Sequence, residues 1–250
     1  MTQIVILLAA TALATACTVP AARIQALRSG RIDQPGGRRL HAQPVPRGGG
    51  LAVCAVMLIA VLLAPLPPEQ RLGIAAAAAA CGWIGWLDDG NPRPPWQRLL
   101  VQALAAVLVL GTGGGLAAIE LGGQAVAAPW LWSILAWVAV VWCLNLYNFM
   151  DGSNGLAAMQ AGVTAAGLAW LGGSDPATQW LALTLAGAAL GFLPWNFPRA
   201  RIFLGDAGSL TLGLVVAVIS LRALQVGALT LPVVLILSSI FAVDATATLL

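Results

Sequence analysis

The stretch NFMDGSNGLA, residues 148–157, lies where one long apolar segment ends and the next begins. It places one carboxylate, two amides and two glycines between segments that carry no charge. The residues just upstream, 137–147, are almost wholly apolar, so Asp151 is predicted at or just beyond the end of a membrane helix, near the lipid headgroups. An ionisable residue at such a place is a functional-site hypothesis by default.

The composition excludes an ordinary soluble domain. Of the 250 residues, 60% are hydrophobic and only 8% are charged, and the mean hydropathy is +0.89. Soluble domains carry about 25% charged residues. We therefore expect a polytopic membrane protein whose surroundings are a lipid bilayer, with no nucleic-acid partner.

Hydropathy predicts about nine membrane spans, each of about 17–22 residues, the length that a helix needs to cross a hydrocarbon core of about 30 Å. The first apolar run also has features of a secretory signal, but no basic residues precede it, so we interpret it as a span. The predicted fold class is all-α, a transmembrane helical bundle forming one domain over residues 1–250. The predicted spans are 3–22, 48–66, 72–87, 98–118, 129–147, 154–173, 178–195, 207–224 and 229–250.

The arginines predict the orientation of the bundle. All twelve basic residues are arginines, and ten of them fall in connections on one side, against Arg71 and Arg222 on the other. The positive-inside rule therefore places the N-terminus outside and the arginine-rich connections in the cytoplasm. The same assignment puts on the cytoplasmic side the acids Asp88, Asp89, Asp151 and Asp206. On the outer side, in short connections, we expect solvated loop charges at Glu69, Glu120 and Asp175.

The first carboxylate motif is LDDGNPRPPWQRL, residues 87–99. Asp88 and Asp89 end an apolar segment, where the helix dipole disfavours negative charge, so helix capping does not explain them. An Asp-Gly turn before Pro92 is one interpretation. The functional one is a pair linked to magnesium or able to accept a proton, because one of two adjacent carboxylates can have a raised pKa.

The second motif spaces four polar residues at intervals of three: Asn145, Asn148, Asp151 and Asn154. On a continuing helix they would line one face, although Gly152 predicts a turn after Asp151. Amides both donate and accept, so they can hold phosphate, sugar or a hydrated metal. Alternatively Asp151 caps the next helix.

The third motif is FLGDAGSL, residues 203–210. Asp206 precedes an apolar helix and could be its N-cap. It could instead be a hard oxygen ligand for magnesium, which often takes one or two carboxylates and completes its shell with substrate phosphate and water. Several acids and amides at one membrane face, beside arginine-rich loops, suit a magnesium-dependent reaction of a diphosphate with a lipid substrate.

Four motifs together resemble glycosyltransferase family 4, the polyprenyl-phosphate N-acetylhexosamine-1-phosphate transferases, which include the MraY and WecA branches. They occur in the family's order and on the family's cytoplasmic side, and the similarity covers nearly the whole chain. The motifs are HAQPVPRGGG (41–50), LDDGNPRPPWQRL (87–99), NLYNFMDGSNGLA (145–157) and FLGDAGSL (203–210).

The resemblance implies a multi-pass enzyme of the bacterial inner membrane with its active site facing the cytoplasm. It implies transfer of an N-acetylhexosamine 1-phosphate from a UDP-N-acetyl sugar to undecaprenyl phosphate, with release of UMP. Such a step initiates a cell-envelope glycan such as the O-antigen of lipopolysaccharide. The implied cofactor is Mg²⁺, which Mn²⁺ can replace, and relatives often form homodimers.

The resemblance also assigns roles to residues. Asp206 would coordinate the metal with Asn145 as a companion ligand. The catalytic residues would be Asp88, which accepts a proton from the lipid phosphate or orients it, Asp89, which supports the metal site, and Asp151, which positions the nucleotide sugar. Substrate would be bound by Asn148, Asn154, Arg47 and His41, with Phe203 stacking on uracil.

Three departures from the family pattern affect this inference. Asn154 stands where many relatives have a second aspartate, lysine is absent, and His41 is the only histidine. The chain stops at DATATLL, where relatives continue into a basic loop with an H-x-H motif and further spans. We therefore interpret the 250 residues as a fragment lacking that loop and the last spans, or else as an inactive variant.

At the level of branches, PVPRGGG and NFMDGSNGLA look closer to WecA, which favours UDP-N-acetylglucosamine or a deoxy N-acetylhexosamine as donor. The alternatives are an MraY-type transferase of phospho-MurNAc-pentapeptide, a secondary transporter and a non-catalytic membrane scaffold. A transporter would place its acids near the bilayer midplane. Here most of them lie at predicted span ends.

Overall fold

The computed structural model describes residues 2–34, 43–121 and 123–249. Over those residues the chain forms nine α-helices, in an order that matches the nine predicted spans. The helices are α1 (Thr2–Arg28), α2 (Gly50–Leu62), α3 (Pro68–Gly90), α4 (Pro95–Gly113), α5 (Pro129–Met150), α6 (Leu156–Leu171), α7 (Pro176–Asn196), α8 (Gly205–Gln225) and α9 (Leu231–Leu249).

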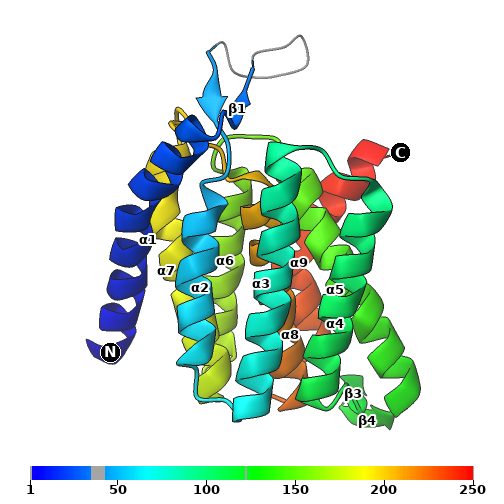
Figure 1. Cartoon of the computed structure of the whole chain (residues 1–250). Helices are drawn as coiled ribbons and strands as arrows, with labels where there is room; N and C mark the ends of the chain where they lie inside the picture. Colours follow the sequence, from blue (N-terminus) through cyan, green and yellow to red (C-terminus); the bar gives the residue numbers. More distant parts are fainter. Residues whose placement is uncertain (1, 35–42, 122, 250) are drawn as a thin grey trace.

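The helices form one bundle in which successive helices run in opposite directions (Figure 1). The start of α1 lies at one end of the bundle, and the end of α9 lies at the other. Five helices, α1, α4, α5, α7 and α8, are long and apolar enough to cross a membrane, and α2, α6 and α9 are shorter apolar helices. The predicted helical membrane fold is therefore confirmed.

Two short antiparallel hairpins were not expected from the sequence. The first pairs β1 (Ile32–Asp33) with β2 (Val45–Pro46), and the second pairs β3 (Ala118–Leu121) with β4 (Gln124–Ala127) at the opposite end of the bundle. The fourth span, predicted to reach residue 118, is wrong at its end. Helix α4 stops at Gly113 because Gly114 and Gly115 take the left-handed conformation, with φ of 83° and 70°.

The centre of the bundle is α8, since 89% of its most apolar 18-residue stretch is buried. Its first turns approach two other helices without intervening side chains. A Cβ on Gly50 of α2 would lie 2.1 Å from the Cα of Gly208, and one on Gly85 of α3 would lie 2.5 Å from the backbone of Asp206 and Ala207. These close contacts hold the starts of α2 and α8 and the end of α3 together.

Asp175 corrects one expectation from the sequence, because it is not a solvated loop charge. Its carboxylate caps α7 by accepting from the backbone N–H and the hydroxyl of Thr178, at 2.9 and 2.8 Å. The same carboxylate accepts from Nε and Nη2 of Arg222, both at 3.1 Å, and Nη1 of Arg222 reaches Gln70 at 3.5 Å. This two-pronged ion pair joins the beginning of α7 to the end of α8.

Replacing Asp175 with asparagine should destabilise the bundle by about 1–3 kcal/mol, because it leaves the half-buried Arg222 without its charged partner. Burial raises the pKa of Asp175, but the hydrogen bonds from Arg222 and Thr178 and the charge of Arg222 lower it further, so the net shift is downward. A depressed pKa stabilises the fold above the unfolded value of about 3.9, and this contribution is lost as the pH falls through the folded pKa.

The measurement is the thermal midpoint of purified protein in detergent from pH 7 down to pH 3. The gap between wild type and Asp175→Asn should be full at pH 7 and should shrink below about pH 4. Glu120→Gln removes an exposed acid at the same end of the bundle and should leave the midpoint unchanged. A pH-independent gap would contradict the assignment.

Candidate active site

Four aspartates from three separate parts of the chain meet where α3 ends and α8 begins, together with two arginines. Arg47, just after β2, pairs through Nε with Asp89 at 2.9 Å and through Nη2 with Asp206 at 2.5 Å. The side chains of Asp89 and Asp206 are 0% and 7% exposed, whereas Arg47 is 39% exposed. The partly exposed guanidinium of Arg47 therefore covers two buried carboxylates.

Asp89 caps α8 from outside that helix. Its Oδ1 accepts the backbone N–H of Asp206 at 2.8 Å, and its Oδ2 accepts that of Ala207 at 3.3 Å. These N–H groups belong to the first turn, which lacks partners within its own helix and carries partial positive charge. Gly205 has a φ of +75°, and a Cβ there would meet the Asp89 carboxylate at 2.6 Å. Glycine is therefore required for Asp89 to reach these amides.

Because Asp89 caps α8, Asp206 is free for another role, and the N-cap interpretation of Asp206 is wrong. The N-cap residue is Leu204, and Asp206 lies within the first turn of α8. Its carboxylate instead faces Arg47 and Arg98.

Arg98, in the first turns of α4, joins three predicted site residues. Its Nη1 lies 3.0 Å from Oδ2 of Asp88 and 3.0 Å from Oδ2 of Asp206. Its Nη2 donates to Oδ1 of Asn148 at 3.3 Å. Asp88 also accepts the backbone N–H of Arg93 at 2.7 Å. Asp88, Asp206 and Asn148 are thus brought together as the sequence predicted.

Sequence reasoning missed the role of Arg98. The residue lies inside the quoted motif 87–99, but it was counted among the arginines that set the orientation. A separation of ten residues from Asp88 is not a spacing that predicts a contact. The two side chains meet because the turn between α3 and α4 brings Arg98 back toward Asp88. A basic residue within a carboxylate motif was the available signal.

Asp151 lies directly after α5 and belongs electrostatically to the same cluster. Burial raises its pKa well above the ordinary value, the charge of Arg47 opposes this shift, and the carboxylates of Asp206 and Asp89 add to it. For Arg47, burial lowers the pKa, but the charges of Asp89, Asp206 and Asp151 outweigh it and raise the pKa overall. Arg47 therefore stays charged beside Asp89 and Asp206, the two acids with which it forms ion pairs.

The first loop and the fourth motif are joined through their backbones beside this cluster. The N–H of Phe203 donates to the carbonyl of Pro46 at 2.8 Å, and the carbonyl of Phe203 accepts from Gly48 and Gly49 at 3.2 and 2.9 Å. Arg47 and Phe203 form a parallel bridge. Phe203 and Arg47 are therefore neighbours, although 156 positions separate them in the sequence.

Two predicted residues, Asn145 and Asn154, form no hydrogen bond or ion pair with the aspartate cluster within the part of the chain that the structure describes. Asn145 donates to Gln102 of α4 at 2.7 Å and to the carbonyl of Val141 at 2.8 Å. Asn154 is exposed and donates to the carbonyl of Pro198 at 3.2 Å. His41 lies outside the described residues. The roles of Asn145 as a metal ligand and of Asn154 and His41 in substrate binding stay predictions.

The donor set suits a divalent cation whose shell is completed by substrate. Within the described part of the chain, no three His, Cys, Asp or Glu side chains are grouped so as to enclose a metal ion by themselves. The Asp88 and Asp206 carboxylates nevertheless converge on the same Nη1 of Arg98, with the oxygen of Asn148 beside them. Mg²⁺ needs only one or two protein carboxylates when phosphate and water supply the rest.

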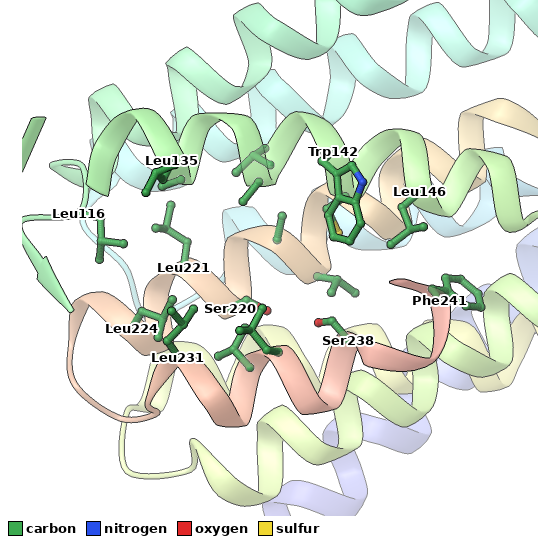
Figure 2. A pocket seen from close by; sticks show the side chains of 18 of the residues that line it. Leu116, Leu135, Trp142, Leu146, Ser220, Leu221, Leu224, Leu231, Ser238 and Phe241 are labelled. Carbon is green, nitrogen blue, oxygen red and sulfur yellow. The ribbon is translucent and has the colours of Figure 1, made fainter. Parts of the chain in front are cut away.

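An apolar cavity of about 240 Å³ lies between α5, α8, α9 and β3. Figure 2 shows Trp142 of α5, Ser220 of α8 and Ser238 of α9 around it. Its lining also includes Leu146 and Tyr147, which immediately precede Asn148 on α5. The cavity therefore extends along the membrane-embedded part of α5 to within one helical turn of the polar cluster.

Comparisons with known proteins show the family of the chain. A family model described as glycosyl transferase family 4 matches residues 71–224. The chain is 37% identical over 226 residues to the decaprenyl-phosphate N-acetylglucosaminephosphotransferase of Mycolicibacterium smegmatis, covering 80% of this chain and 55% of that protein. It is 31% identical over 239 residues to the probable undecaprenyl-phosphate N-acetylglucosaminyl 1-phosphate transferase of Bacillus subtilis, covering 90% and 64%.

The chain is also similar to a transferase whose name gives a different sugar substrate. A phospho-N-acetylmuramoyl-pentapeptide-transferase of Synechococcus is 34% identical over 219 residues, covering 82% of this chain and 64% of that protein. The chain thus spans about 55–64% of the length of these curated relatives. Since the family match covers more than half of the 250 residues and includes Asp88, Asp89, Asp151 and Asp206, the chain belongs to glycosyl transferase family 4.

Proposed function

We propose that this protein transfers an N-acetylhexosamine 1-phosphate from a UDP-sugar to a polyprenyl phosphate at the cytoplasmic face of the bacterial inner membrane. The observation that carries the proposal is the convergence of Asp88, Asp206 and Asn148 on Arg98, one helical turn from an apolar cavity. Polar groups suited to phosphate and a surface suited to hydrocarbon are thereby adjacent. The names of the relatives support N-acetylglucosamine as the sugar and a polyprenyl phosphate, decaprenyl in one relative and undecaprenyl in the other, as the acceptor.

In the proposed reaction an oxygen of the lipid phosphate attacks the phosphorus attached to the sugar. The bond from that phosphorus to the oxygen of UMP breaks, UMP leaves with the electron pair, and a polyprenyl diphosphate sugar forms. A phosphate monoester has its second pKa near 6, so the attacking group is largely dianionic at neutral pH and needs no strong base. Asp88 then serves to orient the acceptor, with its position held by Arg98 and the N–H of Arg93.

Arg47 and Arg98 are suited to bind the negatively charged phosphate groups of the substrates. Arg47 is 39% exposed and Arg98 is 26% exposed, so each can meet a phosphate without leaving its carboxylate partners. Guanidinium groups bind phosphate oxygens in two-pronged fashion. Asn148, held between Arg98 and Ser209, would orient the diphosphate, and Phe203 beside Arg47 would receive the uracil ring.

We further propose that Mg²⁺, held by Asp206, is required. When bound, it would neutralise charge on the diphosphate and on the departing UMP. The acceptor's hydrocarbon tail would lie in the cavity along α5, whose lining is almost entirely apolar near Leu146 and Tyr147.

The test is release of UMP by purified protein, produced with any residues that its gene encodes beyond Leu250, in nanodiscs containing undecaprenyl phosphate. The donors are UDP-N-acetylglucosamine, UDP-N-acetylgalactosamine, UDP-N-acetylfucosamine and UDP-MurNAc-pentapeptide, each with and without Mg²⁺. We expect magnesium-dependent UMP release with an N-acetylhexosamine donor. Turnover of the pentapeptide donor alone would favour the MraY-type reaction, and a folded protein inactive with all four donors would favour the scaffold.

A further inference from the structure

Two side-chain hydrogen bonds join α4 to α5 beside the aspartate cluster. Arg98 and Gln102 lie one turn apart on one face of α4, and Asn145 and Asn148 lie one turn apart on one face of α5. Nη2 of Arg98 donates to Oδ1 of Asn148 at 3.3 Å, and Nδ2 of Asn145 donates to Oε1 of Gln102 at 2.7 Å. The shorter bond therefore lies one helical turn further from the cluster than the contact of Arg98.

Gln102 is an unusual residue for its place in an apolar helix. Its exposure is 0%, and the other buried residues of α4 are Ala105, Ala106 and Val109. Its Nε2 has no hydrogen-bond partner within the part of the chain that the structure describes. A buried donor without a partner costs free energy that an apolar side chain of the same size would not. The cost falls on the amide nitrogen, so the function of Gln102 lies in its carbonyl oxygen, which accepts from Asn145.

The position of α4 relative to α5 depends on few contacts. The two helices lie side by side (Figure 1), but α4 packs against α5 less extensively than α8 does. Only 22% of the most apolar 18-residue stretch of α4 is buried. A further hydrogen bond, from Nε1 of Trp137 to the carbonyl of Ala103 at 3.1 Å, also joins the two helices. Any shift of α4 along α5 would carry Arg98 with it.

We propose that Gln102 and Asn145 are positioning residues of the transferase. Their hydrogen bond holds α4 against α5, so that Arg98 and Asn148 keep the separation at which both face the diphosphate. Asn148 is itself fixed to α8, because its Nδ2 donates to the hydroxyl of Ser209 at 3.0 Å. Arg98 is therefore the member of the pair that must be placed. This inference rests on the proposed function, in which Arg98 and Asn148 meet the substrate phosphates.

On this proposal Asn145 acts on α4 and not on the metal, in contrast to the role that the resemblance implies. Its amide nitrogen donates across to Gln102 and, within its own helix, to the carbonyl of Val141 at 2.8 Å. The second bond fixes the orientation of the amide, so that the first points at α4.

The test uses Gln102→Met and Asn145→Leu, which keep the approximate size of each side chain and remove the hydrogen bond. UMP release from UDP-N-acetylglucosamine is measured on the complete gene product in nanodiscs with undecaprenyl phosphate. We expect kcat to fall about 10–100-fold in each variant, as for other groups that orient a ligand-binding side chain, with the KM of the donor unchanged. The double variant should fall no further, because the two side chains act as one unit.

Stability separates positioning from a merely structural role. Each replacement conserves volume and removes a buried polar group, so the thermal midpoints should stay within about 4 °C of wild type. The matched control is Trp137→Phe, which removes another hydrogen bond between α4 and α5 and should keep the wild-type kcat. An equal loss of kcat in Trp137→Phe would show general loosening of the two helices and would overturn the proposal, as would a normal kcat in Gln102→Met.

The metal role of Asn145 is tested by Mn²⁺ binding, followed by electron paramagnetic resonance in the presence of UMP. We expect Asn145→Leu to bind Mn²⁺ as wild type does. Weaker binding would make Asn145 a metal ligand and overturn its positioning role.

A last measurement does not depend on activity. In protein labelled with isotopic asparagine, the side-chain amide signal of Asn148 is assigned by its absence from Asn148→Ser. This signal should shift in Gln102→Met and stay in place in Trp137→Phe. An unshifted signal in Gln102→Met would overturn the positioning proposal, whereas a wild type that released no UMP from any donor would contradict the proposed function and leave the amide signal to decide the positioning.

Discussion

Asp206→Asn should reduce UMP release by a factor on the order of 10²–10³ while the protein stays folded. The asparagine keeps the size of the side chain but removes the negative charge that Arg47 and Arg98 share and that a divalent cation requires. Losing one preorganised electrostatic contact to a transition state typically has an effect of this size. The fold survives because Asp89 still caps α8, Arg47 keeps its pair with Asp89, and Arg98 keeps its pair with Asp88.

Turnover and the thermal midpoint are measured on the same preparations, together with Mn²⁺ binding followed by electron paramagnetic resonance in the presence of UMP. Glu69→Gln removes an exposed carboxylate at the opposite end of the bundle and should match wild type in all three measurements. If a folded Asp206→Asn protein bound Mn²⁺ and turned over normally, the metal role of Asp206 would be wrong.

Gly85→Ala should damage both stability and activity. The added Cβ would lie 2.5 Å from backbone atoms of Asp206 and Ala207, and backbone atoms cannot rotate away as a side chain can. Separating α3 from α8 should destabilise the bundle by about 1–3 kcal/mol, which lowers the thermal midpoint by roughly 5 °C. The same separation moves Asp89 from the α8 amides and Asp88 from Asp206. Misplacement by about 1 Å can reduce turnover by about 10²-fold.

The matched control is Gly111→Ala, another helical glycine, where an added Cβ would have no neighbouring atom within 4 Å. Alanine has the higher helix propensity, so this variant should keep the wild-type midpoint or raise it slightly. Both variants are compared by scanning fluorimetry and by UMP release. Equal midpoints for the two would show that α3 and α8 do not pack as closely as described.

Much of the site was predictable because its residues stand at the ends of apolar segments. Asp88, Asp89 and Asp206 were assigned to one side of the membrane from segment lengths and arginine counts alone, and they lie together in the fold. Asn148 was predicted from its amide within an apolar run, and it contacts Arg98. Neither the cap that Asp89 forms on α8 nor the contacts of Arg98 were predictable, since both join segments about a hundred positions apart.

Asp175 illustrates the same limit at the other end of the bundle. Its position in a short connection predicted a solvated charge, whereas its pairing with Arg222 depends on how α7 packs against α8. Asn154 was grouped with Asp151 by its spacing. The turn at residues 151–155, in which Gly155 has a φ of +77°, directs it instead toward the carbonyl of Pro198.

By itself the sequence determined the number and order of the helices and the family, and it predicted on which side of the membrane each polar motif lies. These follow from local properties, because a segment's hydrophobicity decides whether it crosses the bilayer and its flanking charges decide its direction. Only the tertiary structure decided which acid caps α8, which arginines cover the carboxylates and where the apolar cavity lies. Those pairings depend on close contacts between helices at Gly50, Gly85 and Gly208, where the absence of a side chain lets distant parts of the chain meet.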